Sequence, residues 1–450
     1  METARTRELA KQDLAHLLHP QTTLNEHAQS GPVAIITEGH GVYVKDSNGK
    51  EYIDGLAELW NVNVGHGRAE IAEAVSEQMK RLAFATTFFG LSHDRAIELS
   101  EKMAEIAPPG INRFMYTSGG SESNETAFKI ARYFWRLNGK ENKYKIIARR
   151  LGYHGVSYGA LSATGIDIFS KNYGPLVPGF LHVPPPYCYR CELGATYPDC
   201  GIACAKALDE AIVKEGPDTV AAFIAEPVQG AGGVIVPPPE YLPMVREICA
   251  KHDVLFIADE VITGFGRTGK MFAVLHWDVK PDMIAMAKGI TSGYVPLGAV
   301  GMTSRIYEGI IGADSMFAHG FTYSGHPVCC AASLANISII EREGLVANSA
   351  EMGNLLLEGL QSLADHPHVG EVRGLGLLAG VEIVEEKNAR RPFDPSQKAV
   401  TGVANRLREK GVMCRAIREM IIAFSPPLCI NADEVNTITS KLKEAIEETL

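Results

Sequence analysis

Two charged side chains directly follow apolar stretches of the sequence. Asp259, with Glu260 beside it, follows VLFIA, and Lys288 follows MIAMA. A lysine or a carboxylate is costly to bury unless it is paired or takes part in chemistry. A lysine and an aspartate facing one crevice suit pyridoxal phosphate, because this cofactor needs a lysine for its Schiff base and an acidic partner for its pyridinium nitrogen. Lys288 alone would instead indicate a lysine whose charged end reaches solvent.

A turn rich in glycine and serine offers a site for the phosphate of such a cofactor. In TSGGSESNETAFK, the run Ser118–Ser121 precedes a helix that we expect to begin near Glu122. Free N–H groups and the positive end of the helix dipole would bind a dianion there, although the same run also fits a plain N-cap. Tyr153, in GYHG, could stack on the cofactor ring; the alternative is a tyrosine packed in the core.

The stretch GFGRTGKM, residues 264–271, contains two short nucleotide-binding patterns. The Walker-type pattern fails because it needs Ser or Thr after the lysine to hold magnesium, and Met271 follows Lys270. The dinucleotide pattern fails because its first glycine should close the strand, whereas five residues separate Ala258 from Gly264. We therefore predict a glycine-rich loop with tight turns.

The stretch GVSYG matches the nucleophile elbow of serine hydrolases around Ser157. That elbow needs its serine on a tight turn between a strand and a helix, but RRLGYH separates it from the nearest predicted strand. A serine at a turn or helix start is the preferred interpretation. Catalysis by Ser157 remains a remote alternative.

Four cysteines are spaced as C-x2-C and C-x3-C in a segment that we interpret as an inserted loop: Cys188, Cys191, Cys200 and Cys204. Four thiolates could hold a structural zinc ion. The eight residues between the two pairs are fewer than in usual zinc ribbons. Free thiols or a disulfide are preferred, and no metal site is predicted.

The elements that must position these residues alternate along the middle of the chain. Strands are predicted at 145–148, 221–225, 254–258, 283–287 and 299–302, and helices at 122–137, 204–214 and 240–251. This order indicates βαβ units and an α/β fold with a mainly parallel sheet and helices on both faces. Ligands then bind beyond the carboxyl ends of the strands, where Asp259 and Lys288 stand.

The two ends of the chain follow a different pattern. A hairpin is predicted around Asn48-Gly49, a long helical stretch at 327–363, and a helix near 396–410. We predict three parts: an opening segment (1–65) that packs with the small domain, a large cofactor-binding domain (66–330) and a small α+β domain (331–450).

Composition limits the classes of partner. The chain has 450 residues and a net charge of −10, which argues against sequence-independent binding of nucleic acid. The opening residues lack the apolar core of a secretory signal, and no apolar run is long enough to span a membrane. Nine cysteines are too few for a disulfide scaffold, so a cytoplasmic location is expected.

In the order of its motifs, the chain resembles the class III pyridoxal-phosphate-dependent aminotransferases, in particular the branch of ω-amino acid or amine:pyruvate transaminases. The similarity covers nearly the whole chain, through VKDSNGKEYIDGLAELWNVNVGHG, AEPVQGAGGVIVPP, ADEVITGFGRTGKM, AKGITSGYVPLGAV, HGFTYSGHPVC and RAIREMIIAFSPPL. This resemblance implies the fold of a type I pyridoxal-phosphate transferase, with a seven-stranded sheet.

The resemblance also implies roles around the cofactor. Lys288 would hold pyridoxal phosphate and serve as general acid and base, with a pKa lowered by burial and by the cationic ring. Asp259 would pair with the ring nitrogen and Glu226 would support it. Val261 would pack on the ring face opposite Tyr153. The residues implied for the phosphate are Gly120, Ser121 and, in a homodimer or tetramer that shares its active sites, Thr322 of the partner subunit.

For the substrate, the resemblance implies an aromatic pocket and an arginine that grips a carboxylate and swings out for an uncharged side chain. These residues would be Trp60, Phe88, Tyr153, Ala231 and Arg415. The chain departs from the usual pattern at two places. Gly119 replaces the first serine of the phosphate site, and Arg418-Glu419 follows Arg415 where the family often has Gly-Asp or Gly-Asn, so that Arg418 could compete for the carboxylate.

The implied reaction is a ping-pong transfer of an amino group to pyruvate. Compatible donors are β-alanine, taurine, diamines and aryl-alkyl amines, and the residue types do not choose among them. An aminomutase or a decarboxylase of the same family would use the same lysine and aspartate, and only product analysis separates these alternatives.

Overall fold

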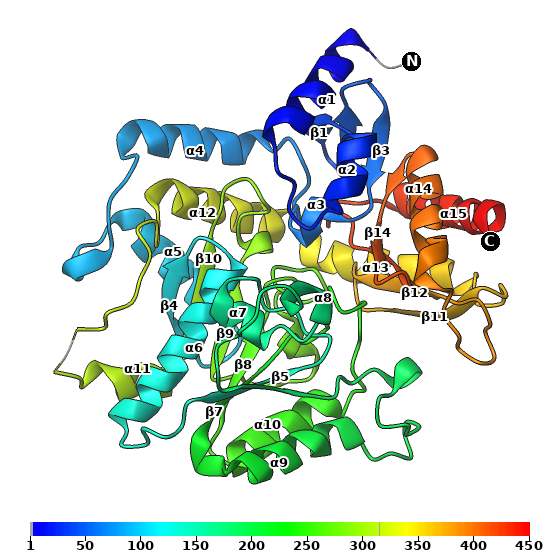
Figure 1. Ribbon diagram of the computed structural model, residues 1–450. Helices are drawn as coiled ribbons and strands as arrows, with labels where there is room; N and C mark the ends of the chain where they lie inside the picture. Colours follow the sequence, from blue (N-terminus) through cyan, green and yellow to red (C-terminus); the bar gives the residue numbers. More distant parts are fainter. Residues whose placement is uncertain (1–2, 315) are drawn as a thin grey trace.

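The computed structural model describes residues 3–314 and 316–450 (Figure 1). Its centre is a seven-stranded sheet with the strand order β4-β10-β9-β8-β7-β5-β6. Strands β9, β8, β7, β5 and β6 are parallel, and only β10 runs antiparallel to both of its neighbours. The bounds are β4 Ile111–Thr117, β5 Lys145–Arg149, β6 Phe180–Val183, β7 Val220–Ala225, β8 Leu255–Asp259, β9 Met283–Met286 and β10 Gly298–Thr303. The prediction of a mainly parallel, seven-stranded sheet is confirmed.

The five predicted strands match β5, β7, β8, β9 and β10 to within one residue at each end. Their strong signal comes from burial: all residues of β7, β8 and β9 are buried, and such strands are continuous apolar runs. The two outer strands were not predicted. In β4, Asn112 and Arg113 interrupt the apolar pattern, and in β6 only Val183 is fully buried.

Helices pack on the sheet, and the predicted ones are present. They are α6 (Gly120–Leu137), α9 (Ala203–Glu215) and α10 (Tyr241–Lys251), with α9 and α10 lying side by side away from α6 (Figure 1). The single helical stretch expected at 327–363 is wrong. Two helices are present, α12 (Pro327–Arg342) and α13 (Leu345–Gln361), because Gly344 between them adopts a positive φ of 62° and ends the first helix.

Two smaller sheets lie beside the large one. The first has the order β1-β2-β3-β13 and the second β11-β12-β15-β14. Strands β2 and β3 form the predicted hairpin, and β3 pairs in parallel with β13, which comes from the far end of the chain. The bounds are β1 Ile36–His40, β2 Tyr43–Asp46, β3 Glu51–Asp54, β11 Val369–Gly374, β12 Ala379–Ile383, β13 Val412–Met413, β14 Arg415–Ile417 and β15 Ile421–Phe424. The domain limits at 65/66 and 330/331 stay a prediction.

The remaining helices enclose these sheets. They are α1 Ala4–His16, α2 Leu24–Ser30, α3 Ala57–Trp60, α4 Ala69–Arg81, α5 Asp94–Ile106, α7 Tyr158–Ala163, α8 Asp167–Ser170, α11 Ser304–Ile311, α14 Ala399–Glu409 and α15 Ala432–Thr449. Among the helices of the described residues, none is long and apolar enough to cross a bilayer.

Candidate active site

The carboxyl ends of β8 and β9 bring Asp259 and Lys288 to the same edge of the large sheet. Asp259 is the last residue of β8 and pairs in register with Ala285 of β9. Lys288 follows β9 after one further residue, in a backbone conformation with φ of 48°. A left-handed conformation is uncommon for a residue other than glycine and is concentrated at functional sites. The predicted juxtaposition of the two strand ends is confirmed.

Asp259 is held by two side chains that the sequence did not single out. Its Oδ2 accepts hydrogen bonds from Asn124 Nδ2 and His154 Nδ1, each at 2.8 Å. Its Oδ1 accepts one from the backbone N–H of Val261 at 3.1 Å. Asn124 and His154 are both buried. Because a carboxylate can only accept, His154 carries a hydrogen on Nδ1, and the two donors fix the orientation of the Asp259 carboxylate.

Position in the sequence gave a weak signal for both residues. Asn124 lies on the first turn of α6, and His154 follows Tyr153 in GYHG. Each lies beside a residue that was selected for another role, and no spacing rule connects either one to Asp259.

Lys288 has the electrostatic properties of a proton-transfer group. Burial lowers its pKa to about 8, while the nearby carboxylates of Asp259 and Glu226 act in the opposite direction and the Arg415 guanidinium adds to the lowering. No hydrogen bond or ion pair from the described residues holds its Nζ. An amine whose pKa lies close to neutral can accept a proton at physiological pH.

Glu226 follows β7 and lies near Asp259 and His154. Its carboxylate accepts hydrogen bonds from the backbone N–H groups of Tyr153 and Gly230, each at 2.9 Å. Burial raises its pKa, the charge of His154 opposes this, and the charge of Asp259 adds to it. Glu226 therefore fixes the backbone of the segment that carries Tyr153.

The start of α6 forms a narrow anion site. A Cβ at Gly120 would lie 2.9 Å from Val261 Cγ1, and a Cβ at Gly155 would lie 2.9 Å from the Cα of Ser121. Two glycines thus let three backbone segments approach each other at the first turn of an 18-residue helix, where N–H groups lack partners within the helix. Beside Gly119, in contrast, the position of a Cβ is open.

Three of the five predicted pocket residues meet in one apolar cluster. Trp60 and Ala231 are buried in it, and Tyr153 packs against it. The Arg415 guanidinium lies over the Trp60 ring, 5.0 Å from its centroid, and burial lowers the Arg415 pKa while the Tyr153 hydroxyl opposes the shift. In the described part of the chain, no carboxylate forms an ion pair with Arg415. Arg415 is thus the fourth predicted pocket residue that contacts this cluster.

Arg418 faces a different group of side chains. Burial lowers its pKa, and Tyr187 and Glu382 oppose the shift. The carboxylate of Glu382 also accepts hydrogen bonds from Arg190, at 2.6 Å, and from Arg373, at 2.9 Å. Arg418 therefore belongs to the surroundings of Glu382, on the side of the cysteine-rich loop.

Phe88 and Thr322, which were predicted to contribute to the site, lie in another region of the chain. The Phe88 ring contacts Phe89 at a centroid distance of 5.9 Å and leaves no room for a Cβ at Gly320. Thr322 is exposed to solvent. Within one chain, the described contacts place neither residue in the cluster around Trp60.

The two rival motifs have other roles. Ser157 Oγ donates to Glu125 at 2.8 Å just before α7, so the serine has a carboxylate partner in place of a catalytic histidine.

In the glycine-rich loop 264–271, Lys270 donates to the carbonyl of Leu275 at 3.1 Å. In the same glycine-rich loop, the buried Arg267 donates to Asn63 at 2.9 Å and to Leu377 at 3.3 Å, so this loop joins distant parts of the chain.

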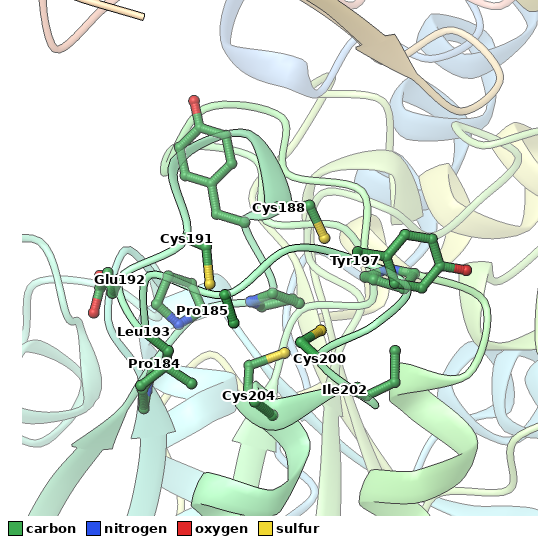
Figure 2. A pocket seen from close by; sticks show the side chains of 15 residues that line it. Pro184, Pro185, Cys188, Cys191, Glu192, Leu193, Tyr197, Cys200, Ile202 and Cys204 are labelled. Carbon is green, nitrogen blue, oxygen red and sulfur yellow. The ribbon is translucent and has the colours of Figure 1, made fainter. Parts of the chain in front are cut away.

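The four cysteines of the inserted loop line one small pocket with Pro184, Pro185 and Tyr197 (Figure 2). All four are free thiols. Among the described residues, no three of their sulfur atoms lie within 4.8 Å of one another. The sulfur atoms are therefore farther apart than the thiolates of a tetrahedral zinc site. Burial and the neighbouring thiols raise the pKa of Cys188 and of Cys204, which favours the protonated form.

Comparison with known proteins agrees with this geometry. The family model for class-III aminotransferases matches residues 25–446. An (S)-enantioselective ω-transaminase from Thermomicrobium roseum has a TM-score of 0.96 to this chain and 47% sequence identity, with 100% of both chains covered. The ω-transaminase of Pseudomonas jessenii in complex with PMP has a TM-score of 0.94 and 41% identity, with 98% of each chain covered.

Two further relatives are similar in sequence over nearly their whole length. Putrescine–pyruvate aminotransferase of Pseudomonas aeruginosa is 41% identical over 452 residues, 99% of this chain and 97% of that enzyme. Diaminobutyrate–2-oxoglutarate transaminase of Halomonas elongata is 41% identical over 451 residues, 98% of this chain and 96% of that enzyme.

Proposed function

The chain belongs to the class III aminotransferases, which depend on pyridoxal phosphate, and we propose that it transfers an amino group from an ω-amino acid or primary amine to pyruvate. A ping-pong order follows, in which the donor product leaves before pyruvate binds. Among donor classes we favour diamines, because the two similar enzymes from Pseudomonas aeruginosa and Halomonas elongata carry putrescine and diaminobutyrate in their names.

The residues present fit the cofactor. Lys288 Nζ has a lowered pKa and no partner among the described residues, Asp259 is buried with its two oxygens held by three hydrogen-bond donors, and the first turn of α6 is open beside Gly119. Gly120 and Ser121 would hold the phosphate, Asp259 the ring nitrogen, and Tyr153 and Val261 the two ring faces. When bound, pyridoxal phosphate supplies an electron sink for the carbanion formed at the substrate.

The chain's own residues supply the proton transfers. In its neutral form, Lys288 Nζ takes the proton from the carbon that bears the donor's amino group, and in its charged form it returns a proton. Asp259, held by Asn124 and His154, stabilises a proton on the ring nitrogen. The buried cluster around Trp60 excludes water and accepts the apolar part of the donor.

One observation carries the choice of an oxo-acid acceptor. The Arg415 guanidinium lies over the Trp60 ring at 5.0 Å and close enough to Lys288 to lower its pKa. An arginine beside the reactive lysine, without a carboxylate partner in the described part of the chain, can form two parallel hydrogen bonds to a substrate carboxylate. Because an aromatic ring holds it only by a cation–π contact, Arg415 can also move away for an uncharged donor.

A donor panel tests this proposal. β-Alanine, taurine, putrescine and 1-phenylethylamine are each incubated with pyruvate and the holoenzyme, and alanine formation is followed. We expect alanine with at least one diamine. Absence of alanine with every donor would reject the proposal, and a rearranged amine or carbon dioxide as the product would identify an aminomutase or a decarboxylase.

A pair of arginine variants tests the acceptor site. Arg415→Met should raise the KM for pyruvate about tenfold or more, because a hydrogen-bonded charge contributes about 1.5–3 kcal/mol, while the KM for a neutral amine stays nearly unchanged. Arg418→Met should leave the KM for pyruvate unchanged, since Arg418 faces Glu382. The reverse result would assign carboxylate binding to Arg418.

We further propose a homodimer in which each subunit completes the other's site with Phe88 and Thr322. An exposed apolar surface beside them supports this: Phe89 is 88% exposed and Tyr323 61% exposed, and Phe84 packs edge-on against Tyr323 at 6.3 Å. Such a surface on a single chain favours association. A cytoplasmic location, also proposed, is supported by nine free cysteines.

A further inference from the structure

A group of metal-ligating side chains lies in the N-terminal segment, apart from the candidate active site. Asp13 is on α1, His27 is on α2, and His19 is in the connection between these helices. One oxygen of Asp13 lies 2.8 Å from His19 Nε2, and its other oxygen lies 3.0 Å from His27 Nε2. All three side chains are partly buried.

The geometry is that of a preformed metal site. The three ligand atoms all lie within 4.8 Å of one another. The two imidazole rings are 4.3 Å apart between centroids, and Nε2 of each ring faces the Asp13 carboxylate. An ordinary surface ion pair needs one cationic partner, whereas here two histidines converge on both oxygens of one aspartate. Two imidazoles and a carboxylate are ligands that Zn²⁺ binds, and a solvent-accessible site leaves the fourth position for water.

We propose that Asp13, His19 and His27 bind one divalent transition-metal ion, with Zn²⁺ as the best match to the ligand set. Each histidine would bind through its unprotonated Nε2, so the hydrogen now shared with Asp13 moves to Nδ1 or leaves to solvent. The two hydrogen bonds to Asp13 are replaced by bonds from all three ligands to the metal.

The proposed metal site lies at the two ends of the segment that joins α1 to α2, and this segment approaches the candidate active site. Residues 17–23 join α1 to α2, and Gln21 in this segment lies close enough to Tyr153 to oppose the upward pKa shift caused by burial of the hydroxyl. A metal ion that ties Asp13 to His27 would hold this segment in place and so fix Gln21 against Tyr153. Metal binding itself does not depend on the proposed amine donor or acceptor.

Zinc titration of the chelator-treated, dialysed holoenzyme tests the proposal directly. Calorimetry should show one saturable equivalent of Zn²⁺ per chain, and Asp13→Asn, His19→Gln or His27→Gln should each remove it. His16→Gln is the matched control, because His16 is an exposed histidine at the end of the same helix α1. Hydrogen exchange in residues 17–23 should slow with Zn²⁺ in the wild type and in His16→Gln, but not in Asp13→Asn.

Cobalt spectroscopy separates this site from the cysteine pocket. Co²⁺ bound by nitrogen and oxygen ligands gives no thiolate-to-metal charge-transfer band, whereas Co²⁺ bound by Cys188 and its neighbours would. The proposal is overturned if the wild type binds no Zn²⁺, if the three substitutions leave binding intact, or if the cobalt complex shows thiolate ligation. Retention of the yellow bound cofactor in these variants would show that they fold.

Discussion

At the residue scale, the surroundings of Lys288 set the pH at which it can accept a proton. Burial lowers its pKa to about 8, and only the neutral amine acts as a base. Below this pH each further unit removes about nine-tenths of the remaining neutral amine, so we expect kcat to fall about tenfold per unit on the acid side. Initial rates of alanine formation between pH 6 and pH 10 would locate the midpoint. A midpoint near 10.4, the value of a lysine in water, would contradict the role of burial.

The charge of Arg415 should affect the direction in which the pH profile moves. The positive charge of Arg415 contributes to lowering the Lys288 pKa, so removing it should move the acid limb of the profile to higher pH. Arg415→Met assayed with saturating pyruvate would show this shift. A shift to lower pH would mean that Arg415 does not act on Lys288 through its charge.

Removal of Lys288 should abolish turnover. General acid–base groups contribute about 10²–10⁴-fold to rate, and Lys288 also anchors the cofactor, so Lys288→Ala should lose at least that factor and the bound yellow colour. Lys270→Ala is the control, because the Lys270 amine donates to the carbonyl of Leu275, outside the candidate active site. Appreciable turnover by Lys288→Ala in a donor assay would remove this residue from the mechanism.

At the scale of elements, two glycines beside α6 should respond differently to substitution. Gly155 has a φ of 117° and leaves no room for a Cβ beside Ser121, whereas Gly119 has extended backbone and open space around it. Gly155→Ala should therefore weaken retention of pyridoxal phosphate, and Gly119→Ser should retain it at least as well as the wild type. Release of cofactor during dialysis, followed by absorbance, compares the two. Equal retention in both variants would argue against a phosphate site at this helix start.

The elements also show which parts of the molecule could be predicted from sequence. Strands buried on both faces gave continuous apolar runs, so β8 and β9 and the residues at their ends, Asp259 and Lys288, were predicted. Asn124 and His154 were missed because their role depends on the distance between α6, the GYHG turn and β8, which is a property of the packed fold. The break between α12 and α13 at Gly344 was missed because glycine can also be tolerated inside a helix.

At the scale of the whole molecule, we expect a dimer on which activity depends. The exposed aromatic surface formed by Phe84, Phe89 and Tyr323 lies beside Phe88 and Thr322, the two residues that we propose to complete the partner's site. Tyr323→Glu should place a charge in this surface and shift the protein toward monomer in sedimentation or light scattering, with loss of cofactor affinity. Tyr307→Glu, at an exposed tyrosine on α11, is the control. A fully active monomer would contradict a shared site.

The parallel pairing of β3 with β13 has a consequence for the order of folding during synthesis. Ile53 donates its backbone hydrogen to Gly411 at 2.9 Å, and Val412 lies opposite Ile53. At roughly 5–20 residues per second, the ribosome needs on the order of tens of seconds to make the residues between these two strands. During that time the edge of the first hairpin has no partner. The outer edge of β3 therefore stays accessible to chaperones or to other chains until β13 leaves the ribosome.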